Sequence, residues 1–211
     1  RDGKSFWVAE RCGANTCLNS NLDTILKFDE TGKLVKSFGA GMIIFPHGIH
    51  VDRDGNIWVT DRRDNLPTAA RGATAPAAAP PAKVIGHQVF KFSPEGKLLM
   101  TLGKAGGAAA PDYFYQPHDI LVAPNGDIFI SEGHGGANSR VLKFNRDGKF
   151  IMSFGSKGSG PGEMDQPHAL AMDSRGRLFV GDRQNNRIQI YDQSGKLLDT
   201  WTQFSRPSGL Y

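Results

Sequence analysis

The chain has 211 residues, of which 39% are hydrophobic and 22% are charged, and its net charge is +4 at pH 7. This composition suits a globular domain with a sizeable core, and no run approaches the ~18–20 apolar residues of a membrane helix, so we expect no membrane span. The basic residues are scattered singly between acids, which argues against a nucleic-acid-binding face. The 26 glycines and 12 prolines predict many turns and few helices.

The first predicted strand covers residues 6–10 and is followed by Arg11. It parallels residues 57–62, and residues 23–39 supply two more strands, so we expect the chain to enter partway into a repeating unit. Cys12 and Cys17 lie between these strands. We favour one short-loop disulfide formed in an oxidising compartment. Two free thiols and a metal pair are the alternatives, and no second cysteine pair completes a structural zinc site.

A repeat dominates the rest of the chain. The dipeptide Pro-His opens three units, at His47, His118 and His168, and a fourth opens with Ser208 in place of histidine. In each complete unit a turn glycine lies eight positions after the histidine, and a short apolar strand ending in an acid follows. The glycines are Gly55, Gly126 and Gly176, and the acids are Asp61, Glu132 and Asp182.

Each unit continues with an alternating strand, a second glycine turn and a last strand. Four short antiparallel strands per unit are the pattern of one propeller blade. We therefore predict an all-β chain with one β-propeller domain over residues 1–211, incomplete at both ends and holding about four blades of a six-bladed ring. Two ion pairs, Glu132 with Arg140 and Asp182 with Arg187, are expected to tie neighbouring strands. Residues 64–86 are rich in Ala and Pro without periodicity, which indicates a loop inserted in one blade.

The repeated histidines are candidate metal ligands. The first strand of every propeller blade lines the central channel, so His47, His118 and His168 should form a ring around one axis. Neutral imidazole nitrogens could hold one metal ion there, and an open coordination position would permit catalysis. The alternative is that each histidine only binds backbone across the channel. Ser208 shows that the turn itself does not require histidine.

The segment from Asp182 to Ile188 (DRQNNRI) resembles the NHL repeat. The chain is similar, along nearly its whole length, to the peptidyl-α-hydroxyglycine α-amidating lyases and their bacterial relatives, for example at Phe45-Pro46-His47-Gly48 and Asn138-Ser139-Arg140.

This resemblance implies a zinc ion held by three histidines from alternate blades, with a structural calcium ion nearby. His47 and His168 match two zinc ligands, and the third belongs to a sixth blade that this sequence does not contain. Arg11 falls at the family's catalytic arginine, and His134 aligns with its catalytic tyrosine. The lyases have no ligand at the position of His118, which is a third-ligand candidate here; a group supporting the ligands or lining the channel is the alternative.

Three functions are open. The first is a metal-dependent lyase that cleaves a peptide ending in α-hydroxyglycine to a peptide amide and glyoxylate, with a small peptide or small-molecule substrate at the channel mouth. The second is a non-catalytic NHL scaffold that binds a protein, peptide or glycan. The third is a calcium-dependent hydrolase similar to the gluconolactonases, which the axial histidines disfavour because calcium prefers oxygen ligands. We expect a secreted or periplasmic location.

Overall fold

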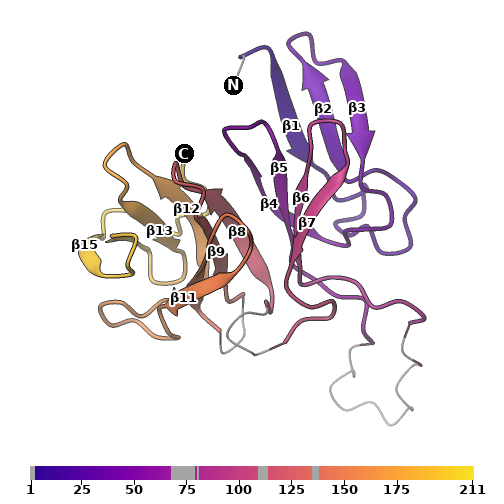
Figure 1. Ribbon diagram of the computed structural model, residues 1–211. Helices are drawn as coiled ribbons and strands as arrows, with labels where there is room; N and C mark the ends of the chain where they lie inside the picture. The colour runs from indigo at the N-terminus through magenta and orange to yellow at the C-terminus, as the bar shows by residue number, and fades with distance from the viewer. Residues whose placement is uncertain (1–2, 68–78, 80, 109–113, 135–137) are drawn as a thin grey trace.

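The computed structural model describes residues 3–67, 79, 81–108, 114–134 and 138–211. Within these ranges the chain forms fifteen β-strands and no helix, so the predicted all-β class is confirmed. The strands build four antiparallel sheets that follow one another in chain order (Figure 1). In the described part of the chain, no helix has the length and apolar character to cross a membrane.

Each sheet is a blade in which neighbouring strands are also consecutive in sequence. The first has three strands, which are β1 (Ser5–Ala9), β2 (Ile25–Asp29) and β3 (Leu34–Phe38). The other three have four strands each: β4 (Pro46–Val51), β5 (Ile57–Asp61), β6 (Val89–Phe92) and β7 (Leu98–Leu102); β8 (Pro117–Val122), β9 (Ile128–Glu132), β10 (Arg140–Phe144) and β11 (Phe150–Phe154); β12 (Pro167–Met172), β13 (Leu178–Asp182), β14 (Arg187–Tyr191) and β15 (Leu197–Trp201).

The first strand of each four-stranded blade (β4, β8 and β12) is its inner strand. The hairpin after this strand is fixed by a side chain and a glycine. In the second blade, Asp52 Oδ1 accepts hydrogen bonds from the backbone N–H groups of Asp54 and Asn56. Gly55 completes the turn at φ +81°, a conformation that glycine adopts without steric cost. The same aspartate-to-glycine arrangement recurs in the fourth blade around Asp173, so the repeated turn signals in the sequence are confirmed.

Apolar side chains pack between successive blades and form the core. Trp58 of β5 lies in one cluster with Ile120 and Leu142 of the third blade. Phe129 of that blade packs in another cluster with Val180 of the fourth. Because each blade buries its faces against its neighbours, the core is a row of interfaces between sheets.

The inner strands β4, β8 and β12 lie beside one another, with β8 in the middle. In all three, the pairing with the second strand of the blade is irregular across the histidine: between Pro46 and Ile49, between Pro117 and Ile120, and between Pro167 and Ala169. Such irregularities redirect a side chain out of the regular ladder. They fall at the same point of each repeat, where the candidate metal ligands stand.

Both predicted ion pairs are confirmed. Arg140 Nε lies 2.6 Å from Glu132 Oε1, and Arg187 Nε lies 2.8 Å from Asp182 Oδ2. Both carboxylates are fully buried, so the pairs tie the second and third strands of their blades from inside.

Residues 68–78 and 80 of the predicted insertion lie outside the described residues. At its base, Asp64 forms an isolated antiparallel bridge with Gly86. The Asn65 side chain donates to Lys83 O and accepts from Ile85 N–H. These contacts join the chain after β5 to the chain before β6, and these two strands belong to one blade.

Candidate functional site

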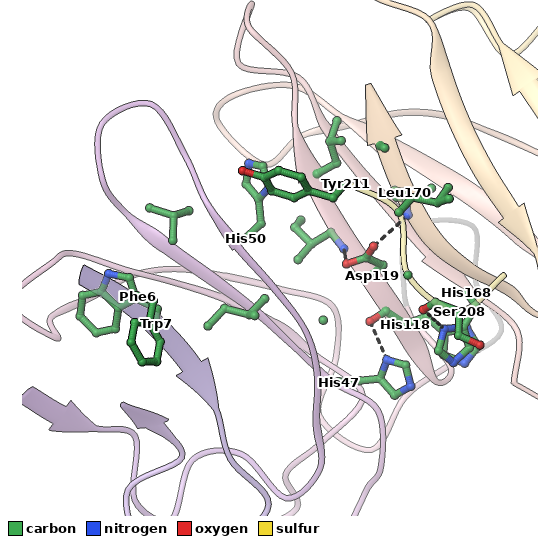
Figure 2. Close-up of a pocket in the computed structure, with 18 of the residues that line it drawn as sticks. Phe6, Trp7, His47, His50, His118, Asp119, His168, Leu170, Ser208 and Tyr211 are labelled. Atoms are coloured by element: carbon green, nitrogen blue, oxygen red, sulfur yellow. Dashed lines mark hydrogen bonds between the residues drawn. The ribbon is translucent and has the colours of Figure 1, made fainter. Parts of the chain in front are cut away.

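The channel histidines, which we define as His47, His118 and His168, form a close triangle. Their ring centroids are 4.9 Å apart for His47 and His118, and 4.8 Å apart for each of the other two pairs. They stand on the neighbouring inner strands β4, β8 and β12 (Figure 2). The three residues therefore converge as the repeat predicts.

Each channel histidine is oriented by a backbone carbonyl farther along the chain. His47 Nδ1 lies 3.1 Å from His118 O, His118 Nδ1 lies 3.0 Å from Pro167 O, and His168 Nδ1 lies 2.9 Å from Ser208 O. A carbonyl oxygen only accepts hydrogen bonds, so Nδ1 carries the proton and Nε2 of each neutral ring keeps a lone pair. Histidines that bind metals in proteins are commonly held in this manner.

The channel histidines are neutral at pH 7. Burial, followed by the electrostatic influence of the nearby His168 and Arg62, lowers the pKa of His47 to about 3. Burial is also the largest cause that lowers the pKa of His118, well below its usual value, and that of His168. Because neutral imidazole is the form that binds a metal, no proton has to be removed from these rings first.

The donor set suits a transition metal. His118 is fully buried, and its Nε2 has no hydrogen-bond partner among the described residues, an arrangement that is unfavourable unless something else satisfies the atom. Within the described ranges, no group of three or more His, Cys, Asp or Glu side chains already has its donor atoms gathered as a formed metal site. The three Nε2 lone pairs nevertheless have the chemistry that zinc binds.

The cavity offers few of the oxygen ligands that calcium prefers. Asp119 is the one carboxylate among the described residues that line the cavity. Its two oxygens accept the backbone N–H groups of Ile120 and Leu170, at 2.9 Å and 2.8 Å, so it joins β8 to β12 (Figure 2). Burial raises the pKa of Asp119 to about 6. Calcium remains a prediction.

Arg11 reaches the same cavity from the loop after β1. Its Nε donates to Pro46 O at 3.0 Å and its Nη1 donates to Asn15 Oδ1 at 2.9 Å, while the guanidinium lies 3.9 Å from the centre of the Phe45 ring. The structure pairs Cys12 with Cys17 in a disulfide, which closes the loop that carries Asn15. The predicted disulfide is thus formed immediately beside Arg11.

His134 follows β9 and stands against the channel histidines. Its ring is 4.9 Å from that of His118 and nearly perpendicular to it. Arg62 Nη2 lies 3.1 Å from His134 Nδ1, and because a guanidinium only donates, this nitrogen is the acceptor. Burial and the Arg62 charge lower the pKa of His134 to about 4. To take up a proton at Nδ1, His134 has to release Arg62.

An open cavity of about 1220 Å³ extends from the channel histidines. Sequence reasoning gave no site role to three polar residues that line it, namely Arg62, Asp119 and Arg183. Arg183 donates to Ser208 Oγ and Gln166 Oε1. The available signal was the repeat itself, since Arg62 and Arg183 each follow the buried acid that ends a second strand.

The blade architecture and the repeated inner strands show that the chain is part of a β-propeller, and its repeats resemble those of the NHL type. Comparisons with known proteins agree: residues 114–203 match the family DUF5128, described as a 6-bladed beta-propeller. The chain resembles two kinds of relative. It is 32% identical over 188 residues to NHL repeat-containing protein 3 of Homo sapiens, covering 86% of this chain and 49% of that protein. It is 31% identical over 195 residues to a probable peptidyl-alpha-hydroxyglycine alpha-amidating lyase of Caenorhabditis elegans, and the match covers 90% of this chain and 49% of that protein.

The chain therefore spans about half the length of these relatives. Among solved structures, a streptogramin B lyase superimposes with a TM-score of 0.61 at 21% identity, covering 95% of this chain and 51% of the other. At that identity the likeness concerns the fold alone. The resemblance predicted from the repeat motifs is confirmed.

Proposed function

We propose that this propeller is a metal-dependent lyase that cleaves a small peptide ending in α-hydroxyglycine to a peptide amide and glyoxylate. The observation that carries the proposal is the triangle of channel histidines, each with Nδ1 bound to a carbonyl and Nε2 left with a lone pair. The similarity to an amidating lyase supports this reaction over other metal-assisted reactions.

The channel histidines would hold zinc through Nε2, and the metal would lower the pKa of the substrate hydroxyl. Arg11 binds the terminal carboxylate of the substrate, since a guanidinium matches a carboxylate with two parallel hydrogen bonds. This contact fixes the reacting carbon in the cavity beside the channel histidines.

His134 receives the hydroxyl proton after it has released Arg62. The oxygen then forms a carbonyl with the same carbon, the C–N bond breaks, and the amide nitrogen takes up a proton. The products are the peptide amide and glyoxylate, and no hydrolytic water is consumed. His134 is neutral at pH 7 because its pKa is lowered to about 4, so it is in the form that accepts a proton.

The second candidate is a non-catalytic scaffold. The observation that favours it is that the chain is as similar to NHL repeat-containing protein 3 as to the amidating lyase. In that case the channel histidines would serve only to join inner strands, and the cavity would bind a peptide, protein or glycan. For either function, the disulfide supports a secreted or periplasmic location.

Bound metal and glyoxylate release distinguish the two candidates. The protein, purified without a histidine tag, would be analysed by elemental mass spectrometry and assayed with an acyl-α-hydroxyglycine. We expect about one zinc per chain and glyoxylate production, both lost in the His47→Ala/His168→Ala double variant. His50→Ala is the matched control, because His50 lies on β4 and lines the cavity outside the triangle. If the unmodified protein holds no metal and releases no glyoxylate, the lyase proposal fails and the non-catalytic scaffold is the better-supported function.

A further inference from the structure

Three arginines surround one aromatic ring at the edge of the cavity. The guanidinium carbons of Arg11, Arg63 and Arg62 lie 3.9, 4.6 and 5.1 Å from the centre of the Phe45 ring. Phe45 is buried, with 2% of its surface exposed, so it is a fixed platform on which the cations stack. Arg11 and Arg62 line the cavity, whereas Arg63 is exposed outside its lining.

In the part of the chain that the structure describes, no carboxylate forms an ion pair with these guanidinium groups or with that of Arg183. Asp61, which directly precedes Arg62, uses its carboxylate to accept the backbone N–H groups of Ile44 and Phe45, and Asp64, which directly follows Arg63, is bound to His87. Burial and the charges of Arg63 and Arg11 lower the pKa of Arg62 to about 10. Like charges held together without a counterion favour the binding of an anion.

Arg62 still has a donor to offer. Its Nη2 binds the neutral ring of His134, but its Nε is buried without a hydrogen-bond partner in the described part of the chain. A buried donor without a partner is unfavourable, and since Arg62 lines the cavity, a rotation of its guanidinium toward the cavity would bring Nε to a ligand oxygen. Arg11, by contrast, already uses Nε on Pro46 O and one Nη1 hydrogen on Asn15, so its Nη2 and second Nη1 hydrogen are the donors left for a carboxylate.

We propose that Arg62 gives the cavity a second anion-binding position beside that of Arg11, so that the preferred ligand carries two carboxylates, one bound by each arginine. The inference rests on the proposed function only in assigning the first carboxylate to Arg11. In a lyase substrate, the second carboxylate would belong to an acidic group on the acyl side of the hydroxyglycine.

The test is isothermal titration calorimetry of the whole chain with three four-carbon probes. Succinate has two carboxylates, succinamate replaces one of them by an uncharged amide of the same shape, and butyrate has one and ends in a methyl group. We expect succinate to bind about tenfold more tightly than either of the others, a difference of about 1.4 kcal/mol. Equal affinities for succinate and succinamate would overturn the proposal, and this comparison needs no variant.

Two variants assign the effect to Arg62. In Arg62→Gln, the preference for succinate over succinamate should fall below about threefold while butyrate affinity stays unchanged. Arg63→Gln removes a neighbouring charge that contacts the same ring from outside the cavity, and it should keep most of the preference. A preference that survives in Arg62→Gln, or is lost equally in Arg63→Gln, would contradict a specific role for Arg62.

The titrations are run on metal-stripped and zinc-loaded protein. If zinc does not bind but succinate is still preferred, the proposed lyase fails and the second anion position stands. If zinc binds and glyoxylate is released while succinate and succinamate bind alike, the lyase stands and the second position fails.

Discussion

At the residue scale, the channel histidines and His87 differ in how their ring nitrogens are bound. The channel histidines give Nδ1 to carbonyls and leave Nε2 for a ligand, whereas His87 uses both nitrogens within the fold. His87 Nδ1 accepts the Gln116 N–H at 3.1 Å, and its Nε2 lies 3.1 Å from Asp64 Oδ2. His87 therefore has a structural role at the base of the insertion, since its hydrogen-bonding capacity is already satisfied.

This arrangement predicts a pH dependence of stability. Burial lowers the pKa of His87, so between that value and the unfolded value of about 6.5 the unfolded chain binds more protons than the folded one. Stability is thus retained above the unfolded pKa and falls as the pH drops below it, by at most about 1.4 kcal/mol per pH unit for one group. Urea unfolding at pH 7 and pH 5 should show a smaller fall for His87→Gln than for the unmodified protein. Equal falls would show that His87 does not contribute.

The sequence located the channel histidines because a repeat places equivalent residues at equivalent points of a propeller. It gave no site role to Arg62, whose partners are Phe45 on the preceding segment and His134, 72 positions farther along. Periodicity identifies which strand a residue occupies and which way it faces, but not which side chains of other blades meet it. For the same reason the bonds of Asp119 to Ile120 and Leu170 could not be predicted, because they depend on how closely β8 approaches β12.

At the scale of elements, strands within a blade are joined by buried ion pairs. Replacing Arg140 by Gln leaves Glu132 of β9 buried without its cation, so we expect a loss of about 3 kcal/mol in unfolding free energy. Lys157→Gln is the comparison, since Lys157 and Asp165 form a pair whose side chains are 46% and 27% exposed, and such pairs contribute below about 1 kcal/mol. Chemical denaturation measures both, and similar losses would contradict a structural role for the buried pair.

Inner strands of neighbouring blades approach too closely for a side chain at Gly48. A Cβ there would lie 2.6 Å from His118 O and 2.7 Å from Asp119 Oδ1, so Gly48→Ala should push β4 away from β8 and lower stability by about 1–3 kcal/mol. Because His47 binds the same carbonyl, metal affinity should fall as well.

Gly209 offers a matched control, because it holds the equivalent position after Ser208 and an added Cβ there meets no atom within 4 Å. Gly209→Ala should therefore leave both stability and metal affinity close to those of the unmodified protein. A Gly48→Ala variant as stable as Gly209→Ala would show that the two inner strands can separate without penalty.

At the scale of the whole molecule, the proposed metal would join three blades. His47, His118 and His168 come from three separate sheets. These sheets also contact one another through apolar clusters and through hydrogen bonds such as that from Leu170 N–H to the Asp119 carboxylate. A ligand that binds only the folded state stabilises it by mass action. Zinc should therefore stabilise the whole arrangement of blades, and not only the site.

We expect free zinc at one hundred times its Kd to raise the unfolding free energy by about 2.7 kcal/mol, with a matching rise in Tm. His118→Gln should reduce the rise if His118 is a ligand, and His47→Ala/His168→Ala should abolish it, because each removes nitrogen donors from the triangle. His87→Gln serves as the control, since it removes a histidine that is bound to Asp64 and Gln116 instead, and it should keep the full rise. Differential scanning calorimetry with and without zinc measures all four proteins. A rise that persists in the double variant would show that the metal binds elsewhere. A full rise in His118→Gln would show that His118 only lines the channel. In that case this chain would supply two ligands, His47 and His168, and a third would still be needed.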